Sequence, residues 1–239
     1  VANEIELARY CIEFAIKSGA SAARLSLNKN VMDAYTVLNG ELDKVSHSAD
    51  RSIYLYLYVD GRYGTFSTNR LETEDLEKFI IQSITMVRML GEDKYRSLPS
   101  PERTAKDART GRELGMYDCR YEDSSSDTRL ERAKEMSIFS QIAGKEYTLI
   151  SEECEYSESY DDSITIDSQG FEGRHTESAF SFFAEVTIQD NEGNRYSGYW
   201  WDTTPRKSDD DPAECSRKAL ERAVAQIGPQ PRRSGRARM

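Results

Sequence analysis

The side chains that most often perform catalysis are few in this chain, and they do not gather along the sequence. Its two histidines, His47 and His175, each lie in a stretch with the alternating polarity of a β-strand. Neither has an acidic or histidine partner four residues away on a helix, so no H-E-x-x-H type of metal site can form locally. A metal shared by the two histidines is the alternative, but strand histidines are far more often exposed or hydrogen-bonded without a metal.

The four cysteines are spread far apart and show no C-x-x-C spacing: Cys11, Cys119, Cys154 and Cys215. This sparse spacing suits neither a zinc knuckle nor a disulfide framework, and it predicts reduced thiols in a cytosolic protein. The sequence has no glycine-rich phosphate loop after a strand pattern and no G-x-S-x-G nucleophile elbow. It therefore predicts no catalytic residue and no metal ligand in this chain.

Acidic residues form three clusters that raise the question of a calcium or magnesium site. They are Glu152, Glu153 and Glu155, then Asp161 and Asp162, then Asp209 to Asp211. None of them combines alternating oxygen ligands with the turn glycine that a calcium loop requires. We expect these clusters to be solvated edges.

Aromatic residues near the end of the chain are the best candidates for a binding role. Tyr199, Trp200 and Trp201 follow Tyr196 in a stretch with strand character. Adjacent side chains on a strand point to opposite faces, so one of the two tryptophans is expected to be exposed or covered by another surface. Our first hypothesis is that they belong to the core and a domain interface. The alternative is a peptide-binding groove, because aromatic residues serve both purposes.

The overall composition is that of a folded, acidic protein. The 239 residues are 38% hydrophobic and 31% charged, and the net charge is -10. Such a balance repels phosphate backbones, so nucleic-acid binding is not expected. The only basic run is the tail PQPRRSGRARM, with Arg232, Arg233, Arg236 and Arg238. Two prolines break the preceding helix there, and we expect a linker.

Neither a membrane span nor a secretory signal is expected. The sequence has no run of 18 apolar residues, and its first residues, VANEIELARYCIEF, lack the basic and apolar regions of a signal peptide. The expected location is the cytoplasm.

Hydrophobic periodicity predicts the same order of helices and strands in both halves of the chain. Residues 3–18 have helical spacing that ends at Gly19, and alternation begins at Ala22. Asn39-Gly40 and Asp60-Gly61 tolerate the positive φ values of tight hairpin turns. Thr73 is predicted to cap a second helix that ends at Gly91.

The second half repeats this order after a polar stretch at 92–126 with no apolar period. A helix is predicted from Asp127 to Gly144, followed by strand-like runs at 145–160, 163–190 and 194–203. A last helix is predicted to open at Asp211, Pro212 and Glu214 and to end at Gly228.

The predicted fold is α+β, with two similar helix–antiparallel-sheet–helix halves and helices packed on sheet faces. The predicted domains are a first half at 1–91, a linker at 92–126, a second half at 127–228 and a tail at 229–239.

Two long stretches resemble the TldD/PmbA family, whose members are often labelled modulators of DNA gyrase. VLNGELDKVSHSADRSIYLYLYVDGRYGTFSTNRL with the following ETEDLEKFIIQSITMVR is similar to the family's N-terminal domain. DSQGFEGRHTESAFSFFAEVTIQDNEGNRYSGYWWDTT with DPAECSRKALERAVAQIG is similar to its second block. EDKYRSLPSPE is more similar to the PmbA (TldE) branch than to the TldD branch.

The resemblance implies a part in a zinc-dependent protease that acts on unfolded or modified peptides, in peptide maturation and antitoxin proteolysis. In the family the zinc site lies in the TldD-type subunit, on a helix with an H-E-x-x-x-H motif. This sequence has no such motif, so no catalytic or metal residue carries over, and zinc is expected only in a TldD-type partner subunit.

The partners that the resemblance implies are a TldD-type subunit, or self-association into an oligomer, and an unfolded peptide, in the bacterial cytoplasm. SGRARM is similar to the segment that opens the family's C-terminal domain, so the tail is expected to lead toward a domain outside these residues. The alternative function is a scaffold or interaction domain that regulates DNA gyrase. An independent hydrolase is the third alternative, and it has the least support in the sequence.

Overall fold

One six-stranded antiparallel sheet organises the whole chain. The computed structural model describes residues 2–106, 110–141, 146–207, 211–229 and 235. The strand order is β3-β2-β1-β4-β5-β6. The strands and α-helices are α1 (Ala2–Lys17), β1 (Ala22–Leu38), β2 (Glu41–Val59), β3 (Arg62–Thr68), α2 (Thr73–Val87), α3 (Ser126–Glu135), β4 (Tyr147–Asp167), β5 (Glu172–Asp190), β6 (Arg195–Thr204) and α4 (Ala213–Val224).

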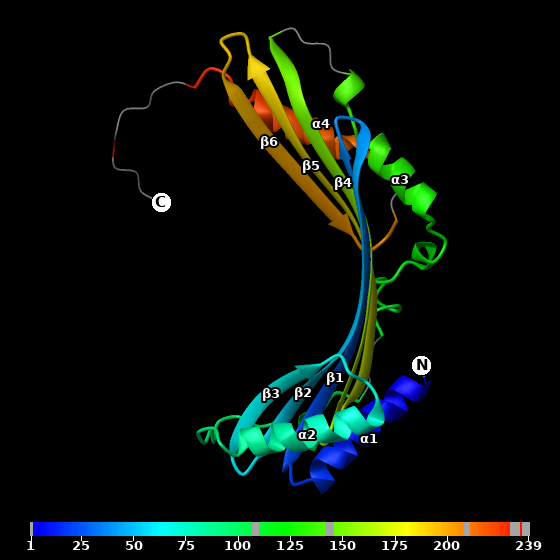
Figure 1. The fold of residues 1–239 in the computed structure, drawn as a ribbon, viewed down its shortest axis with the longest axis vertical. Helices are drawn as coiled ribbons and strands as arrows, with labels where there is room; N and C mark the ends of the chain where they lie inside the picture. Colours follow the sequence, from blue (N-terminus) through cyan, green and yellow to red (C-terminus); the bar gives the residue numbers. More distant parts are fainter. Residues whose placement is uncertain (1, 107–109, 142–145, 208–210, 230–234, 236–239) are drawn as a thin grey trace.

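Each half of the chain gives three strands to this sheet, and the pairing of β1 with β4 joins the halves. In Figure 1 the sheet curves along its length, and the helices lie on its outer, convex side. The predicted α+β fold, with antiparallel strands and helices packed on the sheet, is confirmed.

Both hydrophobic cores lie on the same face of the sheet. On β1, Leu25 and Leu27 belong to the core that contains residues of α1 and α2, whereas Tyr35 and Val37 belong to the core that contains residues of α3 and α4. All four are odd-numbered, and alternate residues of a strand face the same side. The helices of both halves therefore cover one face. We call the opposite side, which none of the helices described here covers, the uncovered face.

Tight turns connect the strands as the sequence predicts. At Asn39-Gly40 the φ values are 52° and 86°, and at Asp60-Gly61 they are 48° and 70°. Positive φ at both central residues is the geometry of the two-residue hairpin turn that matches strand twist. The turn between β5 and β6 is closed by Asp190, whose carboxylate accepts hydrogen bonds from the backbone N–H groups of Glu192 and Asn194, at 2.9 and 2.8 Å.

The middle of the helix-bearing face is polar and is covered by part of the predicted linker. The N–H groups of Thr176 and Ser178 on β5 donate to the carbonyls of Thr110 and Met116, at 2.7 and 2.9 Å. Beneath this segment the fully buried carboxylate of Glu158 accepts hydrogen bonds from three side chains, those of Ser124, Arg129 and Tyr156, at 2.8 to 3.0 Å. Between α2 and α3 the described residues form two short 3-10 helices, Pro101–Arg103 and Cys119–Tyr121, and this segment completes the polar centre.

The acidic clusters are not all solvated edges, which corrects the sequence prediction. Glu152 is fully buried, and it accepts hydrogen bonds from the backbone N–H groups of Ile138 and Phe139, at 2.9 and 3.1 Å. Asp162 is 6% exposed, and Arg174 donates two hydrogen bonds to it, at 2.6 and 2.7 Å. Asp209 and Asp210 lie outside the described residues.

Several element boundaries also differ from the predictions, since α2 ends at Val87 rather than at Gly91 and α4 ends at Val224 rather than at Gly228. The third helix ends at Glu135, because Glu152 binds the N–H groups just beyond it and turns the chain. The strand runs predicted at 145–160 and 163–190 form the longer strand β4 and a separate β5, with the turn at 168–171. Thr73 is the first residue of α2 rather than its cap, and the N-cap residue makes no side-chain hydrogen bond.

Candidate functional site

The predicted aromatic residues lie on β6, an edge strand of the sheet. Tyr199 and Trp201 point to the uncovered face and are 55% and 63% exposed, whereas Trp200 points to the helix-bearing side and packs against the core. Alternation along the strand thus separates the adjacent tryptophans, as the sequence predicts. The structure places Tyr199 and Trp201 together and Trp200 apart from them.

A row of side chains crosses the uncovered face from Trp201. Trp201 is the register partner of Phe183, which pairs with Glu155, which in turn pairs with Thr36. The Thr36 hydroxyl donates to the Glu155 carboxylate at 3.3 Å. In the next row, Tyr199 pairs with Glu185. This end of the face therefore combines exposed aromatic rings with carboxylates, a combination that suits a chain segment with apolar and basic side chains.

The backbone of the same two residues faces outward from the sheet. The N–H of Asp190 donates to the carbonyl of Asn194 at 3.0 Å, which makes these two residues a hydrogen-bonded pair. Antiparallel pairs alternate, so the even-numbered residues of β6 bond to β5 and the odd-numbered ones point away from it. Tyr199 and Trp201 consequently direct both backbone and side chain toward open surface at the edge of the sheet.

The open part of this edge is short, because polar side chains occupy both of its ends. The Gln226 side chain donates to the carbonyl of Ser197 at 2.6 Å, and the carboxylate of Asp202 accepts the N–H of Thr203 at 2.8 Å. Between them, no hydrogen bond of a described residue reaches the outward groups of Tyr199 and Trp201. An extended chain segment could add here as a further strand.

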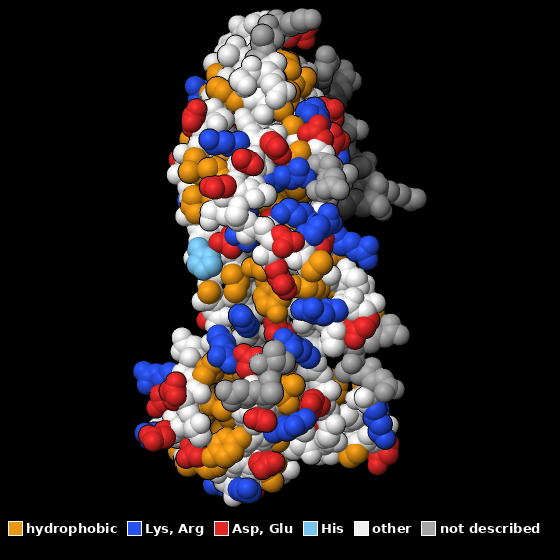
Figure 2. All heavy atoms as spheres, turned by 90° about the vertical axis from the view of Figure 1, so that its right-hand side faces the viewer, with side chains coloured by type: hydrophobic (Ala, Val, Ile, Leu, Met, Phe, Trp, Pro, Cys, Tyr) orange, Lys and Arg blue, Asp and Glu red, His pale blue; other side chains and the backbone are white. Residues whose placement is uncertain are grey.

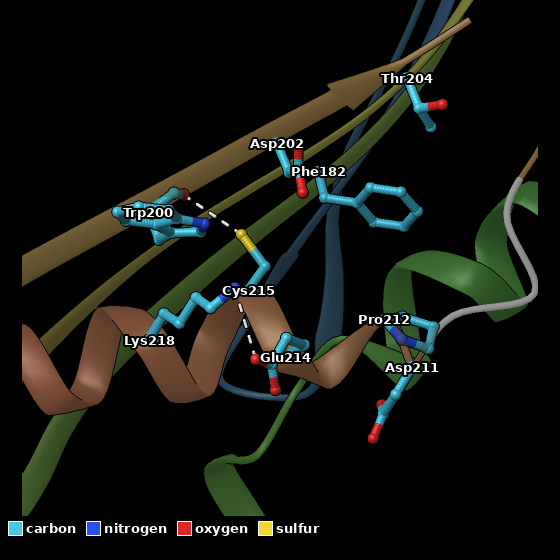
Figure 3. A pocket seen from close by; sticks show the side chains of 9 residues that line it. All are labelled: Phe182, Trp200, Asp202, Thr204, Asp211, Pro212, Glu214, Cys215 and Lys218. Carbon is cyan, nitrogen blue, oxygen red and sulfur yellow. Dashed lines mark hydrogen bonds and ion pairs between the residues drawn. The ribbon is translucent and has the colours of Figure 1, made fainter. Parts of the chain in front are cut away.

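A pocket of about 430 Å³ lies on the other side of β6, between this strand and α4 (Figure 3). Its walls include the rings of Phe182 and Trp200, and its polar lining includes Asp202, Glu214 and Lys218. The ring of Trp200 is already in contact with cations, since Lys218 Nζ lies 5.4 Å and Arg222 Cζ 4.3 Å from its centre. These contacts attach α4 to β6 and leave the ring little capacity for another cation.

The cysteine in this pocket is not an activated nucleophile. The Cys215 thiol donates to the carbonyl of Trp200 at 3.2 Å, and burial raises its pKa to about 11. Burial likewise raises the pKa of Cys154 to about 12 and that of Cys11 to about 11. These thiols are protonated at neutral pH, and a protonated thiol is a poor nucleophile.

The two histidines do not form a metal site with their surroundings. His47 Nδ1 lies 2.7 Å from a carboxylate oxygen of Asp33, and His175 Nε2 lies 3.0 Å from one of Glu177. Within the described ranges, His, Cys, Asp and Glu side chains nowhere form a group of three or more that could hold a metal ion. With one carboxylate beside each histidine and no third ligand in reach, these described residues do not fit a zinc centre.

The helix-bearing face carries charges of both signs. Figure 2, which looks onto this side, shows acidic and basic side chains mixed across the middle of the molecule. Such mixing provides no continuous basic surface for a phosphate backbone on this face. The four arginines of the tail lie outside the described residues. None of the helices described here is long and apolar enough to cross a membrane.

Family models match both halves of this fold. The model of the PmbA/TldA metallopeptidase domain 1 matches residues 23–87, and that of the PmbA/TldA metallopeptidase central domain matches residues 120–227. The chain belongs to the PmbA/TldD family. A comparison with curated proteins gives no significant match.

Solved structures of three relatives share the fold. A protein of Bacteroides thetaiotaomicron named as a modulator of DNA gyrase is 30% identical, with a TM-score of 0.89 over 98% of this chain and 52% of that one. A protein of Thermotoga maritima with the same description is 20% identical, with a TM-score of 0.77 over 96% and 50%. TldE from Thermococcus kodakarensis is 15% identical, with a TM-score of 0.66 over 92% and 47%. The chain spans about half the length of these PmbA/TldD relatives.

Proposed function

We propose that this chain is the N-terminal, non-catalytic part of a PmbA/TldD protein that works in a zinc metallopeptidase assembly. The assembly acts on unfolded or modified peptides in the cytoplasm, in processes such as peptide maturation and antitoxin proteolysis. Support comes from the two family models, both of which describe metallopeptidase domains. In this proposal the catalytic zinc belongs to a TldD-type partner subunit, and the described residues of this chain contain no group of three or more His, Cys, Asp and Glu side chains that could hold it.

The observation that carries this proposal is the coincidence of two features at Tyr199 and Trp201. Their side chains are exposed on the uncovered face, and their backbone groups point outward from the edge of the sheet. Strand addition binds an extended peptide through its backbone and is therefore independent of most of its sequence. A subunit that handles many unfolded peptides needs that property, and exposed aromatic rings add affinity for apolar side chains.

The test is a titration of a fluorescently labelled unfolded peptide with this chain, with and without a TldD-type subunit. We expect binding that strengthens when the TldD-type subunit is present. The double variant Tyr199→Ala/Trp201→Ala should weaken it about tenfold, which corresponds to about 1.4 kcal/mol. The matched control is Tyr95→Ala, since Tyr95 is an aromatic residue with 86% exposure in the loop after α2. Equal weakening by both variants would contradict the proposed site.

The second candidate is a scaffold or interaction domain that regulates DNA gyrase. It is favoured by the names of the two bacterial relatives, which describe modulators of DNA gyrase. Under this alternative the peptide titration shows no binding in either condition, while the chain co-sediments with purified gyrase. Peptide binding that depends on Tyr199 and Trp201, with no gyrase association, supports the peptidase assembly instead.

A further inference from the structure

The longest open edge of the sheet lies on β2 rather than on β6. The strand β3 pairs only with residues 53–59 of β2, so the earlier part of β2 has a strand partner on one side alone. Every residue from Glu41 to Arg51 is exposed, including the apolar side chains of Leu42 and Val45, which are 43% and 53% exposed. A free strand edge of this length is a template for pairing with another chain.

The hairpin at Asp60-Gly61 determines which residues of this edge are free. A two-residue turn makes its flanking residues Val59 and Arg62 a hydrogen-bonded pair, so the odd-numbered residues of β2 point away from β1. The outward backbone groups before β3 begins are those of Val45, His47, Ala49 and Arg51. In the described part of the chain, nothing hydrogen-bonds to them on that side. A β-bulge at Asp43 ends this regular stretch.

We infer that this edge binds the same edge of a second copy of the chain, in antiparallel register with His47 opposite the partner's His47. The sequence from Lys44 to Asp50 is complementary to itself in this register. Lys44 lies opposite the partner's Asp50, Val45 opposite the partner's Ala49, and Ser46 opposite the partner's Ser48. The two-fold axis repeats each pair, so the seam contains two ion pairs, two apolar pairs and two hydroxyl pairs. Opposite charges and hydroxyl pairs facing across strands stabilise a sheet.

The register is specific, because neighbouring registers lose the complementarity. A shift of two residues places Lys44 opposite the partner's Ser48 or Ser52, and Asp50 then loses its ion pair. The direction of the backbone groups fits the same register. Val45, His47 and Ala49 have free outward backbone groups, and in this register each lies opposite a partner residue whose backbone groups also point outward. The strand β3 also limits the choice. In the register centred on His47, the paired segment from Lys44 to Asp50 ends before Ile53, where β2 begins to pair with β3.

The charges argue for a second copy as the partner. An unrelated strand would have to supply opposite charges at both ends of the segment, whereas this chain supplies them by its own order of residues. Pairing would continue the sheet of one copy into that of the other through β2 and the partner's β2, and it would cover the exposed Val45. This inference does not depend on the proposed peptidase function, because it concerns a different edge of the sheet.

The test is the mass of the full chain in solution by sedimentation equilibrium, measured up to the hundred-micromolar range. We expect a dimer that dissociates as salt rises, because its ion pairs are exposed. Lys44→Glu faces an acidic residue and Asp50→Lys faces a basic one, so each variant alone should be monomeric. An equimolar mixture of the two variants restores both ion pairs and should form a mixed dimer. A mixture that stays monomeric would refute the register.

A second variant tests the backbone pairing independently of charge. Ala49→Pro removes an outward N–H, and proline is tolerated on a strand edge where its nitrogen faces solvent. It should abolish the dimer while leaving the far-ultraviolet circular dichroism and the melting temperature near those of the parent. Ala49→Val is the matched control, because it keeps the N–H and the dimer. A chain that is monomeric throughout, or a dimer that persists in both Ala49→Pro and Lys44→Glu, would overturn the inference.

Discussion

The guanidinium carbon of Arg222 on α4 lies 4.3 Å from the centre of the Trp200 ring on β6. This contact, together with Lys218 at 5.4 Å from the same ring, joins the last helix to the edge of the sheet. The next residue, Trp201, lies on the opposite face and has no such role. Two adjacent tryptophans thus serve the protein differently, one in packing and one at an exposed surface.

Replacement of the two tryptophans should therefore have very different effects on stability. Trp200→Ala is expected to lower the free energy of unfolding by about 2 kcal/mol, because it leaves a gap beneath α4 and removes the contacts with Lys218 and Arg222. Trp201→Ala should change it by no more than about 0.5 kcal/mol, as for most exposed positions. Urea denaturation of both variants is the measurement. Similar losses in the two would show that Trp201 also has a structural role.

Local signals in the sequence predicted much of this fold. The pairs Asn39-Gly40 and Asp60-Gly61 are hairpin turns, because the positive φ that their residue types tolerate is the φ that such turns need. The opposite orientation of Trp200 and Trp201 follows from strand geometry alone. These features depend on residues that are close in the sequence, and local chemistry decides them.

Features that depend on residues far apart in the sequence were not predicted. Asp161 on β4 accepts a hydrogen bond from Asn30 on β1 at 2.6 Å. This contact pairs polar side chains of the two strands at a point where their apolar alternation is interrupted. Glu152, which lies on β4, accepts a hydrogen bond from a backbone N–H just beyond the third helix and so helps to end that helix. The free edge at Tyr199 and Trp201 was also missed, since it depends on which strand lies last in the sheet. No single segment contains that information.

Gly61 should tolerate a side chain poorly, although the space around it is open. A Cβ at this position would have no atom within 4 Å, but the backbone φ is 70°, a value at which β-branched residues are strained. Gly61→Val is expected to lower the free energy of unfolding by about 1 to 3 kcal/mol. The matched control is Gly91→Val, because Gly91 also faces open space and has no positive φ. Equal melting temperatures for the two variants would contradict the strain argument.

Asp118 should contribute stability that is lost at low pH. Its carboxylate accepts hydrogen bonds from the Arg120 guanidinium, the strongest cause, and from backbone N–H groups that include Lys207, and together these lower its pKa from 3.8 to about 2. A depressed pKa in the folded state stabilises the protein above the unfolded value, and this contribution disappears as pH falls from about 4 toward 2. Asp118→Asn should therefore be less stable at pH 7 and lose less stability across that range. Parallel pH dependences in chemical denaturation would contradict the assignment.

Gly198 should be the position on β6 where even one methyl group is not accepted. A Cβ there would lie 2.4 Å from the carbonyl oxygen of Ala219 and 2.5 Å from the backbone nitrogen of Ala223, both on α4. Backbone atoms cannot move aside as a flexible side chain can, so Gly198→Ala must push the helix away from the strand, at a cost of about 1 to 3 kcal/mol. Gly91→Ala is the matched control, because it adds the same group to open space.

The position of α4 can be followed by fluorescence. In a Trp201→Phe background Trp200 is the only tryptophan, so its emission reports directly how α4 packs against β6. We expect Gly198→Ala to shift that emission toward longer wavelengths as the ring gains contact with water. A variant with unchanged emission and unchanged stability would show that α4 does not pack against the backbone of β6 in solution.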